Sequence, residues 1–216
     1  MSTRDRDRPL ARRWFLSRFG ATAAAIGAAL SATGAHARAQ STSAGRWAPA
    51  RHRQDDWLGQ LPGAHRFVFD TTNPEGFSTA LQFANNYFVA NQTGYGLKDG
   101  DLAVVIIARH HSTQHAYNNA VWTKYRTELV KAADVAALPD IAERLERLLK
   151  RGVHLAVCQM ATRRIAGSIA RATGGDADTV YNELAANLVA NAHLVPAGIV
   201  ALNRAQERGY SFAHAG

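Results

Sequence analysis

The chain has 216 residues, with 25 Lys and Arg against 17 Asp and Glu, and a single cysteine. This length suits one ordinary domain with its own hydrophobic core, and one cysteine excludes an internal disulfide. The formal net charge of +8 would be compatible with a nucleic-acid partner. However, no basic stripe with interleaved aromatic residues is present, and we expect no nucleic-acid binding.

The first forty residues have the layout of an export signal, with a basic start, an apolar stretch and small residues before a break. The adjacent Arg12 and Arg13, followed by Trp-Phe-Leu, resemble a twin-arginine signal, and an ordinary secretion signal is the alternative. We predict that residues 1–39 are removed by cleavage near Ala39, with Ala37 as the alternative. Their loss takes away seven arginines and two acidic residues and lowers the net charge from +8 to +3. We therefore expect a periplasmic protein that meets the twin-arginine translocase during export.

Residues 40–63 mix Ser, Gly, Pro and charged residues without a hydrophobic period, which is typical of a flexible linker. Trp47 or Trp57 could dock part of this linker on the domain. The predicted domain then covers residues 64–216.

Within this domain, apolar runs predict strands at 66–71, 102–108, 153–158 and 192–196, with 210–213 as a possible fifth strand. Helical spacing predicts helices at 75–92, 112–125, 138–152, 160–172, 178–190 and 197–209. The run LAVVIIA at 102–108 has no polar alternation and indicates a central strand covered on both faces. The alternation of strands and helices predicts an α/β fold, a three-layer α/β/α arrangement around a mainly parallel sheet of four or five strands.

Ligands of open parallel sheets bind at the carboxyl ends of the strands. Cys158 ends the third predicted strand, directly before a helix whose free N–H groups favour a thiolate. The alternative is a small apolar residue of the core. We expect Arg109, Arg163, Arg164 and Asn118 to bind an anionic ligand.

The segment RHHSTQH supplies a histidine cluster. His110 and His111 are candidate proton partners for the thiol of Cys158. His111 and His115 are four residues apart and would share a helix face, which is a weak indication of a zinc or copper site. Such a site needs a third ligand, from His110, Cys158 or Asp70. Loop histidines without a metal are the alternative. Neither GxGxxG nor a P-loop is present, and we expect no cofactor.

Three stretches together resemble the DsrE/DsrF-like proteins of sulfur relay and sulfur oxidation, in an exported branch. These stretches are VVIIARHHSTQHAYNNAVWTKY, GVHLAVCQMATRR and LVPAGIVALNRAQERGYSF. The similarity runs from His65 to Phe212. It implies a three-layer α/β fold, assembly into trimers or hexamers, and a persulfide on Cys158 that passes sulfur to a partner protein. The sequence thus favours a periplasmic sulfur carrier of the sulfurtransferase type. The alternative is a non-catalytic oligomeric module that binds a small ligand or a metal.

Overall fold

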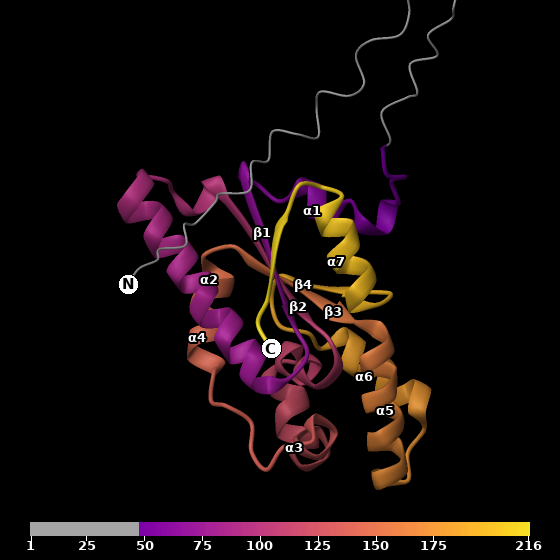
Figure 1. Ribbon diagram of the computed structural model, residues 1–216. Helices are drawn as coiled ribbons and strands as arrows, with labels where there is room; N and C mark the ends of the chain where they lie inside the picture. Colours follow the sequence, from indigo (N-terminus) through magenta and orange to yellow (C-terminus); the bar gives the residue numbers. More distant parts are fainter. Residues whose placement is uncertain (1–47) are drawn as a thin grey trace, which may run out of the picture. The chain divides into compact units, whose positions relative to one another are not determined.

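The computed structural model describes residues 48–216. The predicted export signal and Trp47 lie outside the described residues. Five strands form one parallel sheet in the order β4-β3-β2-β1-β5 (Figure 1). They are β1 (His65–Thr71), β2 (Leu102–Ala108), β3 (Val153–Cys158), β4 (Ala192–Val195) and β5 (Ser211–His214). The sheet confirms the predicted fold class, and all seven residues of the central β2 are buried.

Helices cover both faces of the sheet. One face carries α2 (Pro74–Tyr95) and α4 (Ala142–Lys150), which bury Phe77, Phe88, Leu145 and Leu148 against it. The other face carries α7 (Gly198–Gln206) and the short α1 (Trp57–Gln60), which lie on the opposite side of the sheet in Figure 1. These two layers complete the predicted three-layer arrangement.

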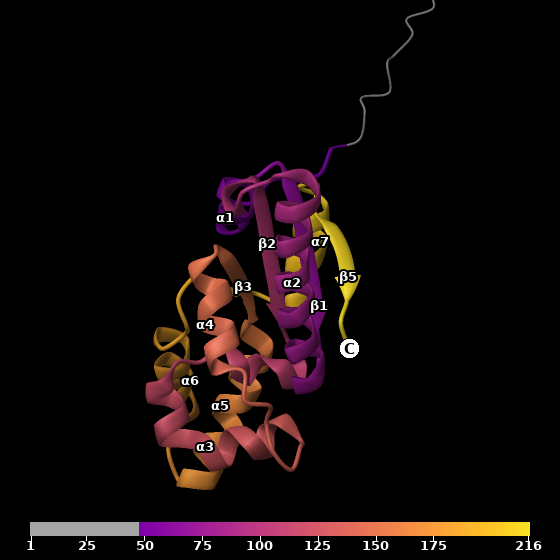
Figure 2. The ribbon, with the colours of Figure 1, turned by 90° about the vertical axis from the view of Figure 1, so that its left-hand side faces the viewer.

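A second group of helices lies beyond the carboxyl ends of the strands. It consists of α3 (Asn119–Ala133), α5 (Gln159–Thr173) and α6 (Ala177–Ala186). Figure 2 shows them below the sheet, away from α1. Their apolar faces form a separate cluster around Leu129, Ile165, Ile169 and Leu184. This helical group therefore builds one wall of the carboxyl edge.

The helix predicted at 112–125 is wrong in its first half. Residues His110–Ala116 form a 3₁₀ helix, η3, and Tyr117 is extended, with φ −89° and ψ 147°. The helix α3 starts only after Asn118, whose side-chain oxygen accepts hydrogen bonds from the N–H groups of Ala120 and Val121. A side-chain cap of this kind satisfies N–H groups that otherwise have no partner, and it fixes the start of the helix locally.

Further helix boundaries differ from the prediction: α3 continues to Ala133 rather than ending at 125, and the start of α4 and the end of α6 also move. The helix α4 begins at Ala142 rather than at 138, because a proline at 139 disfavours helical backbone before it and Ile141 has a non-helical φ of −125°. The helix α6 ends at Ala186 rather than at 190, since Asn187 leaves the helical region with φ −120° and ψ 48°. Residues 187–191 then reverse the direction of the chain before β4.

The segment predicted as a flexible linker over 40–63 packs on the domain in its second half. Residues Arg53–Asp55 form a 3₁₀ helix, η1, and α1 follows directly. Leu58 and Leu61 are buried in the same cluster as the residues of α7 and of that face of the sheet. The ring of Trp57 stacks on His193 at a centroid distance of 3.9 Å. Buried apolar side chains of this size stabilise the attachment and hold the segment in place.

A 3₁₀ turn, η2 (Asp99–Asp101), leads from α2 into β2. None of the helices within residues 48–216 combines the length and the apolar character needed to span a membrane.

Candidate functional site

Four neighbouring strands bring polar side chains to the carboxyl edge of the sheet. Asp70 of β1 lies opposite His214 of β5 in the parallel register, while Arg109 directly follows β2 and Cys158 ends β3. Side chains alternate along a strand, so residues two positions apart share a face. The residues two positions before Asp70, Arg109 and Cys158 all pack in the cluster under α7: Val68, Ile107 and Ala156. The four polar side chains therefore share the face that α7 covers.

Asp70 is the centre of this group. Its carboxylate is 3% exposed and accepts two hydrogen bonds from Arg109, Nε to Oδ1 at 2.7 Å and Nη2 to Oδ2 at 2.7 Å. The Nδ1 of His214 lies 3.1 Å from the same Oδ2. A two-pronged guanidinium–carboxylate pair of this kind is strong and directional. It fixes the plane of the Arg109 guanidinium at the edge of the sheet.

Arg109 is electrostatically coupled to both Asp70 and Cys158. Hydrogen bonding to Asp70 raises the pKa of Arg109, burial opposes this rise, and the negative charges of Asp70 and of a Cys158 thiolate add to it. The guanidinium charge therefore acts on the sulfur position as well as on the carboxylate. Arg109 and Cys158 thus lie within reach of charge–charge interaction at the same edge of the sheet.

Two neighbours hold Arg109 in place. The hydroxyl of Ser112 accepts a hydrogen bond from the Arg109 backbone N–H at 3.0 Å and lies 2.9 Å from the Thr71 hydroxyl. The first residue of α7, Gly198, packs directly on the arginine. A Cβ at Gly198 would lie 2.7 Å from the Cβ and 2.8 Å from the Cδ of Arg109. Only glycine lets the helix approach the arginine this closely.

Cys158 occupies the N-cap position of α5 and is 7% exposed. Its side chain makes no capping hydrogen bond, while its carbonyl accepts from the Thr162 hydroxyl at 3.0 Å. The Thr162 hydroxyl also accepts from the phenol of Tyr117 at 3.1 Å. The backbone at the sulfur is thus fixed by buried hydrogen bonds, and the nearly buried sulfur favours small reactants over bulky ones.

The two candidate proton partners differ in environment. His110 is exposed and has a left-handed backbone with φ 53°, an uncommon conformation for a residue with a side chain. His111 is partly buried, and its Nδ1 donates to the carbonyl of Ala132 at 3.1 Å. This hydrogen bond leaves the Nε2 of His111 with a free lone pair.

The predicted anion ligands are not all brought to Cys158. The guanidinium of Arg163 lies over the ring of Tyr181 at 3.9 Å, beside Asp178 at 3.4 Å, and so faces α6. Arg164 donates to the carbonyl of His110 at 3.4 Å and remains close to the site. Asn118 is used as the cap of α3. Arg109 is therefore the predicted anion ligand that interacts with Cys158, while Arg164 contacts the segment that follows β2.

The fold does not assemble the weakly predicted metal site on His111 and His115. A 3₁₀ helix has three residues per turn, so residues four apart diverge. His111 contacts Ala132, whereas the ring of His115 stacks on Phe77 at a centroid distance of 4.9 Å. Residues 48–216 contain no group of three His, Cys, Asp or Glu side chains suited to hold a metal ion.

His115 instead belongs to a second feature, a cleft of about 660 Å³ between α3 and α4. The ring is 5% exposed, its Nε2 has no hydrogen-bond partner, and burial lowers its pKa to about 4. The histidine is therefore neutral at pH 7. The other walls include the aromatic ring of Trp122 and the apolar side chains Leu138, Ile141, Leu145 and Leu149.

The sequence did not indicate the Asp70–Arg109–His214 group as a unit. Asp70 and Arg109 were recognisable as residues at strand ends, but His214 was not. The available signal was that a fifth parallel strand must also end at the carboxyl edge. No protein-family model matches the chain, and no curated protein is similar enough to count as a match.

Proposed function

We propose that the chain is an exported DsrE/DsrF-like protein that carries sulfane sulfur as a persulfide on Cys158. The main support is the position of Cys158 at the ligand-binding edge, where a charge on its sulfur interacts with Arg109. The resemblance of the sequence around Cys158 to the family's cysteine segment points to the same residue. Sulfur transfer can be carried out with one thiol and one fixed cation, which is what this edge of the sheet supplies.

The transfer begins with a Cys158 thiolate, whose proton goes to exposed His110 or to the Nε2 of His111. With thiosulfate as donor, the thiolate attacks the outer sulfur, the S–S bond of thiosulfate breaks, and sulfite leaves with the bonding electron pair. Cys158 then carries a terminal anionic sulfur. An acceptor thiolate attacks that sulfur and releases the Cys158 thiolate.

Asp70 and Arg109 act on this cycle through charge. The Arg109 guanidinium stabilises the anionic sulfur before and after the transfer. Asp70, with both oxygens bonded to Arg109, keeps the guanidinium from swinging away. Because Cys158 is only 7% exposed, the donor and the acceptor must each reach it with a sulfur atom that carries no bulky substituents around it.

The proposal includes the location and assembly of the protein. The twin-arginine-like start supports export to the periplasm with removal of residues 1–39. The family resemblance supports a trimer or hexamer that works with a sulfur donor and an acceptor protein. Cell fractionation with N-terminal sequencing tests the first point, and light scattering after size-exclusion chromatography tests the second.

Intact-mass measurement tests the sulfur-carrier proposal directly. Purified protein is incubated with thiosulfate or polysulfide, and a reducible adduct of about 32 Da, one sulfur atom, is expected. The control is Cys158→Ser, which must show no adduct. If no donor gives an adduct on the wild-type protein, Cys158 is not a sulfur carrier.

A second candidate function is a non-catalytic binding module, and the cleft that contains His115 favours it. The cleft has the size of ordinary small-molecule sites and combines apolar walls with the neutral imidazole of His115 and the charged side chains of Arg126, Asp140 and Glu146. Ala142 lines it from the exposed start of α4, so Ala142→Phe should fill it without disturbing the core. Native mass spectrometry would then show a small molecule on the wild-type protein and none on the variant. A wild-type protein that carries no small molecule, even from cell extract, would count against this function.

A further inference from the structure

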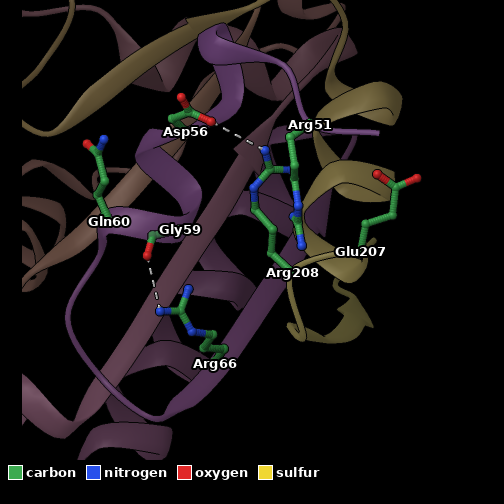
Figure 3. Close-up of a pocket in the computed structure, with 7 residues that line it drawn as sticks. All are labelled: Arg51, Asp56, Gly59, Gln60, Arg66, Glu207 and Arg208. Atoms are coloured by element: carbon green, nitrogen blue, oxygen red, sulfur yellow. Dashed lines mark hydrogen bonds and ion pairs between the residues drawn. The ribbon is translucent and has the colours of Figure 1, made fainter. Parts of the chain in front are cut away.

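A hollow of about 480 Å³ lies at the opposite end of the sheet from Cys158. It is formed by the segment before η1, by α1, by the start of β1 and by the end of α7 (Figure 3). Five charged side chains line it, three of them arginines: Arg51, Asp56, Arg66, Glu207 and Arg208. The positive charges therefore outnumber the negative ones.

Two of these arginines, Arg66 and Arg208, lie in the inner part of the hollow. Arg66 has no carboxylate partner among the described residues. Its guanidinium donates to the carbonyls of Leu58 at 2.9 Å and Leu61 at 3.1 Å, and it lies 5.3 Å from the centre of the Tyr210 ring. Figure 3 shows it turned toward the carbonyl of Gly59, at 3.5 Å. These neutral acceptors satisfy donors, but they leave the positive charge without a counterion.

The guanidinium of Arg208 has fewer hydrogen-bond partners than that of Arg66. Its side chain is 5% exposed, Nη1 donates to the Arg204 carbonyl at 3.2 Å, and Nη2 is buried without a hydrogen-bond partner. The Asp56 carboxylate forms a long ion pair with Nη2 at 4.0 Å, drawn as a dashed line in Figure 3, but this distance is too long for a hydrogen bond. Buried guanidinium nitrogens normally donate to an acceptor, so the Nη2 of Arg208, which has none, indicates a place for a further acceptor such as an anion.

The remaining carboxylates do not supply that anion. Glu207 is bonded to Arg204 through both oxygens, at 3.0 and 2.9 Å. Asp55 also faces Arg204, at 3.6 Å. Asp56 is half-exposed and reaches Arg208 only at 4.0 Å. The hollow thus retains the charge of Arg66, which has no carboxylate partner within residues 48–216, and that of Arg208, which Asp56 offsets only at 4.0 Å, with exposed Arg51 at its rim.

We propose that this hollow is a binding site for a tetrahedral oxyanion of the sulfate or phosphate type. Guanidinium donors match the oxygen spacing of such an ion and can bind it in a two-pronged way. The Nη2 of Arg208, which lacks a hydrogen-bond partner, supplies an inner donor, and exposed Arg51 adds a third cation at the rim. Three cations favour a doubly charged ion over a simple carboxylate. The site is independent of the sulfur chemistry proposed for Cys158, because it lies at the amino edge of the sheet.

Equilibrium dialysis of the purified protein with radiolabelled sulfate at low ionic strength tests the site, and unlabelled phosphate serves as competitor. We expect one sulfate per chain, displaced by phosphate but not by chloride at equal ionic strength. Arg51→Gln should weaken binding roughly threefold, as the loss of one exposed charge. The matched control is Arg53→Gln, an exposed arginine of the same segment that does not line the hollow, which should leave binding unchanged.

Arg208→Lys keeps the positive charge but removes the planar set of guanidinium donors that can bind two oxygens at once. We expect it to weaken sulfate binding by at least about tenfold. Circular dichroism checks that this variant folds, and Arg51→Gln carries the test if it does not. Sulfate stabilises most proteins non-specifically, so thermal shifts count only as differences between variant and control. If no sulfate binds, or if Arg51→Gln and Arg53→Gln lose the same amount of sulfate affinity, the hollow does not bind a free oxyanion.

A lipid phosphate presents the same chemistry as a free ion, so a second arm separates the two sources. The protein is sedimented with vesicles of phosphatidic acid or of phosphatidylcholine. Binding of free sulfate without sedimentation supports a soluble oxyanion as the ligand. Sedimentation only with phosphatidic acid, lost in Arg51→Gln and kept in Arg53→Gln, supports a headgroup. Failure in both arms refutes the proposal.

Discussion

Replacing Asp70 with asparagine is expected to lower the free energy of unfolding by about 3 kcal/mol. The side chain is 3% exposed, and its two oxygens accept from Arg109 at 2.7 Å each. Asparagine keeps the shape, but it loses the charge and turns an amide N–H toward a guanidinium donor. Breaking one side of a buried ion pair costs about 3–5 kcal/mol. The lower end applies because the Arg109 side chain is 19% exposed and can be partly hydrated.

Urea unfolding measures this loss as a shift of the midpoint. With a slope of about 1–3 kcal/mol per M, the midpoint should fall by about 1–3 M. The control is Glu146→Gln, which breaks an exposed pair with Lys150 and should leave the midpoint in place. A double-mutant cycle with Arg109→Met isolates the coupling. If the two substitutions are additive, or if the Asp70→Asn midpoint equals that of the control, the ion pair does not organise the site.

Two further predictions concern burial and close packing. Burial lowers the pKa of His115 to about 4, below the value of about 6.5 in an unfolded chain. Between these two pH values the unfolded state therefore binds more protons than the folded state. The free energy of unfolding is highest above about pH 6.5 and falls by about 2 kcal/mol by pH 5. His115→Leu should remove this part of the pH dependence in urea unfolding, and equal slopes in both proteins would contradict it. Gly198→Ala should destabilise by about 1–3 kcal/mol, because the new Cβ would lie 2.7 Å from Arg109. By contrast, Gly94→Ala, a helical position with open space, should stabilise slightly in the same assay, and the same sign in both variants would refute the packing argument.

The elements that were predictable are those whose signal is local. The run 102–108 has no polar residue, and the structure buries it completely as β2. The helix boundaries at 112–125 were missed for a reason that is only partly local. Helical spacing continues through Tyr117, but that residue is drawn out into an antiparallel bridge with Leu188, and Asn118 restarts the helix. Long-range pairing overrides periodicity at such a position.

The candidate site divides in the same way. The positions of Cys158 and Arg109 at strand ends could be predicted, because the carboxyl ends of parallel strands share one edge. The direction of Arg163 could not be predicted, since it depends on the ring of Tyr181 in a helix that follows later. The same holds for the Nη2 of Arg208, which has no hydrogen-bond partner because Glu207 binds Arg204 and Asp56 of the docked N-terminal segment stays 4.0 Å away.

The sequence alone therefore determined the α/β class, the parallel central strand and the edge of the sheet at which Cys158 lies. Each follows from hydrophobic periodicity and chain connectivity, which are properties of neighbouring residues. Only the tertiary structure decided the strand order, with β5 beside β1, and thereby the contact of His214 with Asp70. Strand order and side-chain partners depend on how distant segments pack. That outcome is set by the sum of many small burial energies, and no single stretch of sequence contains it.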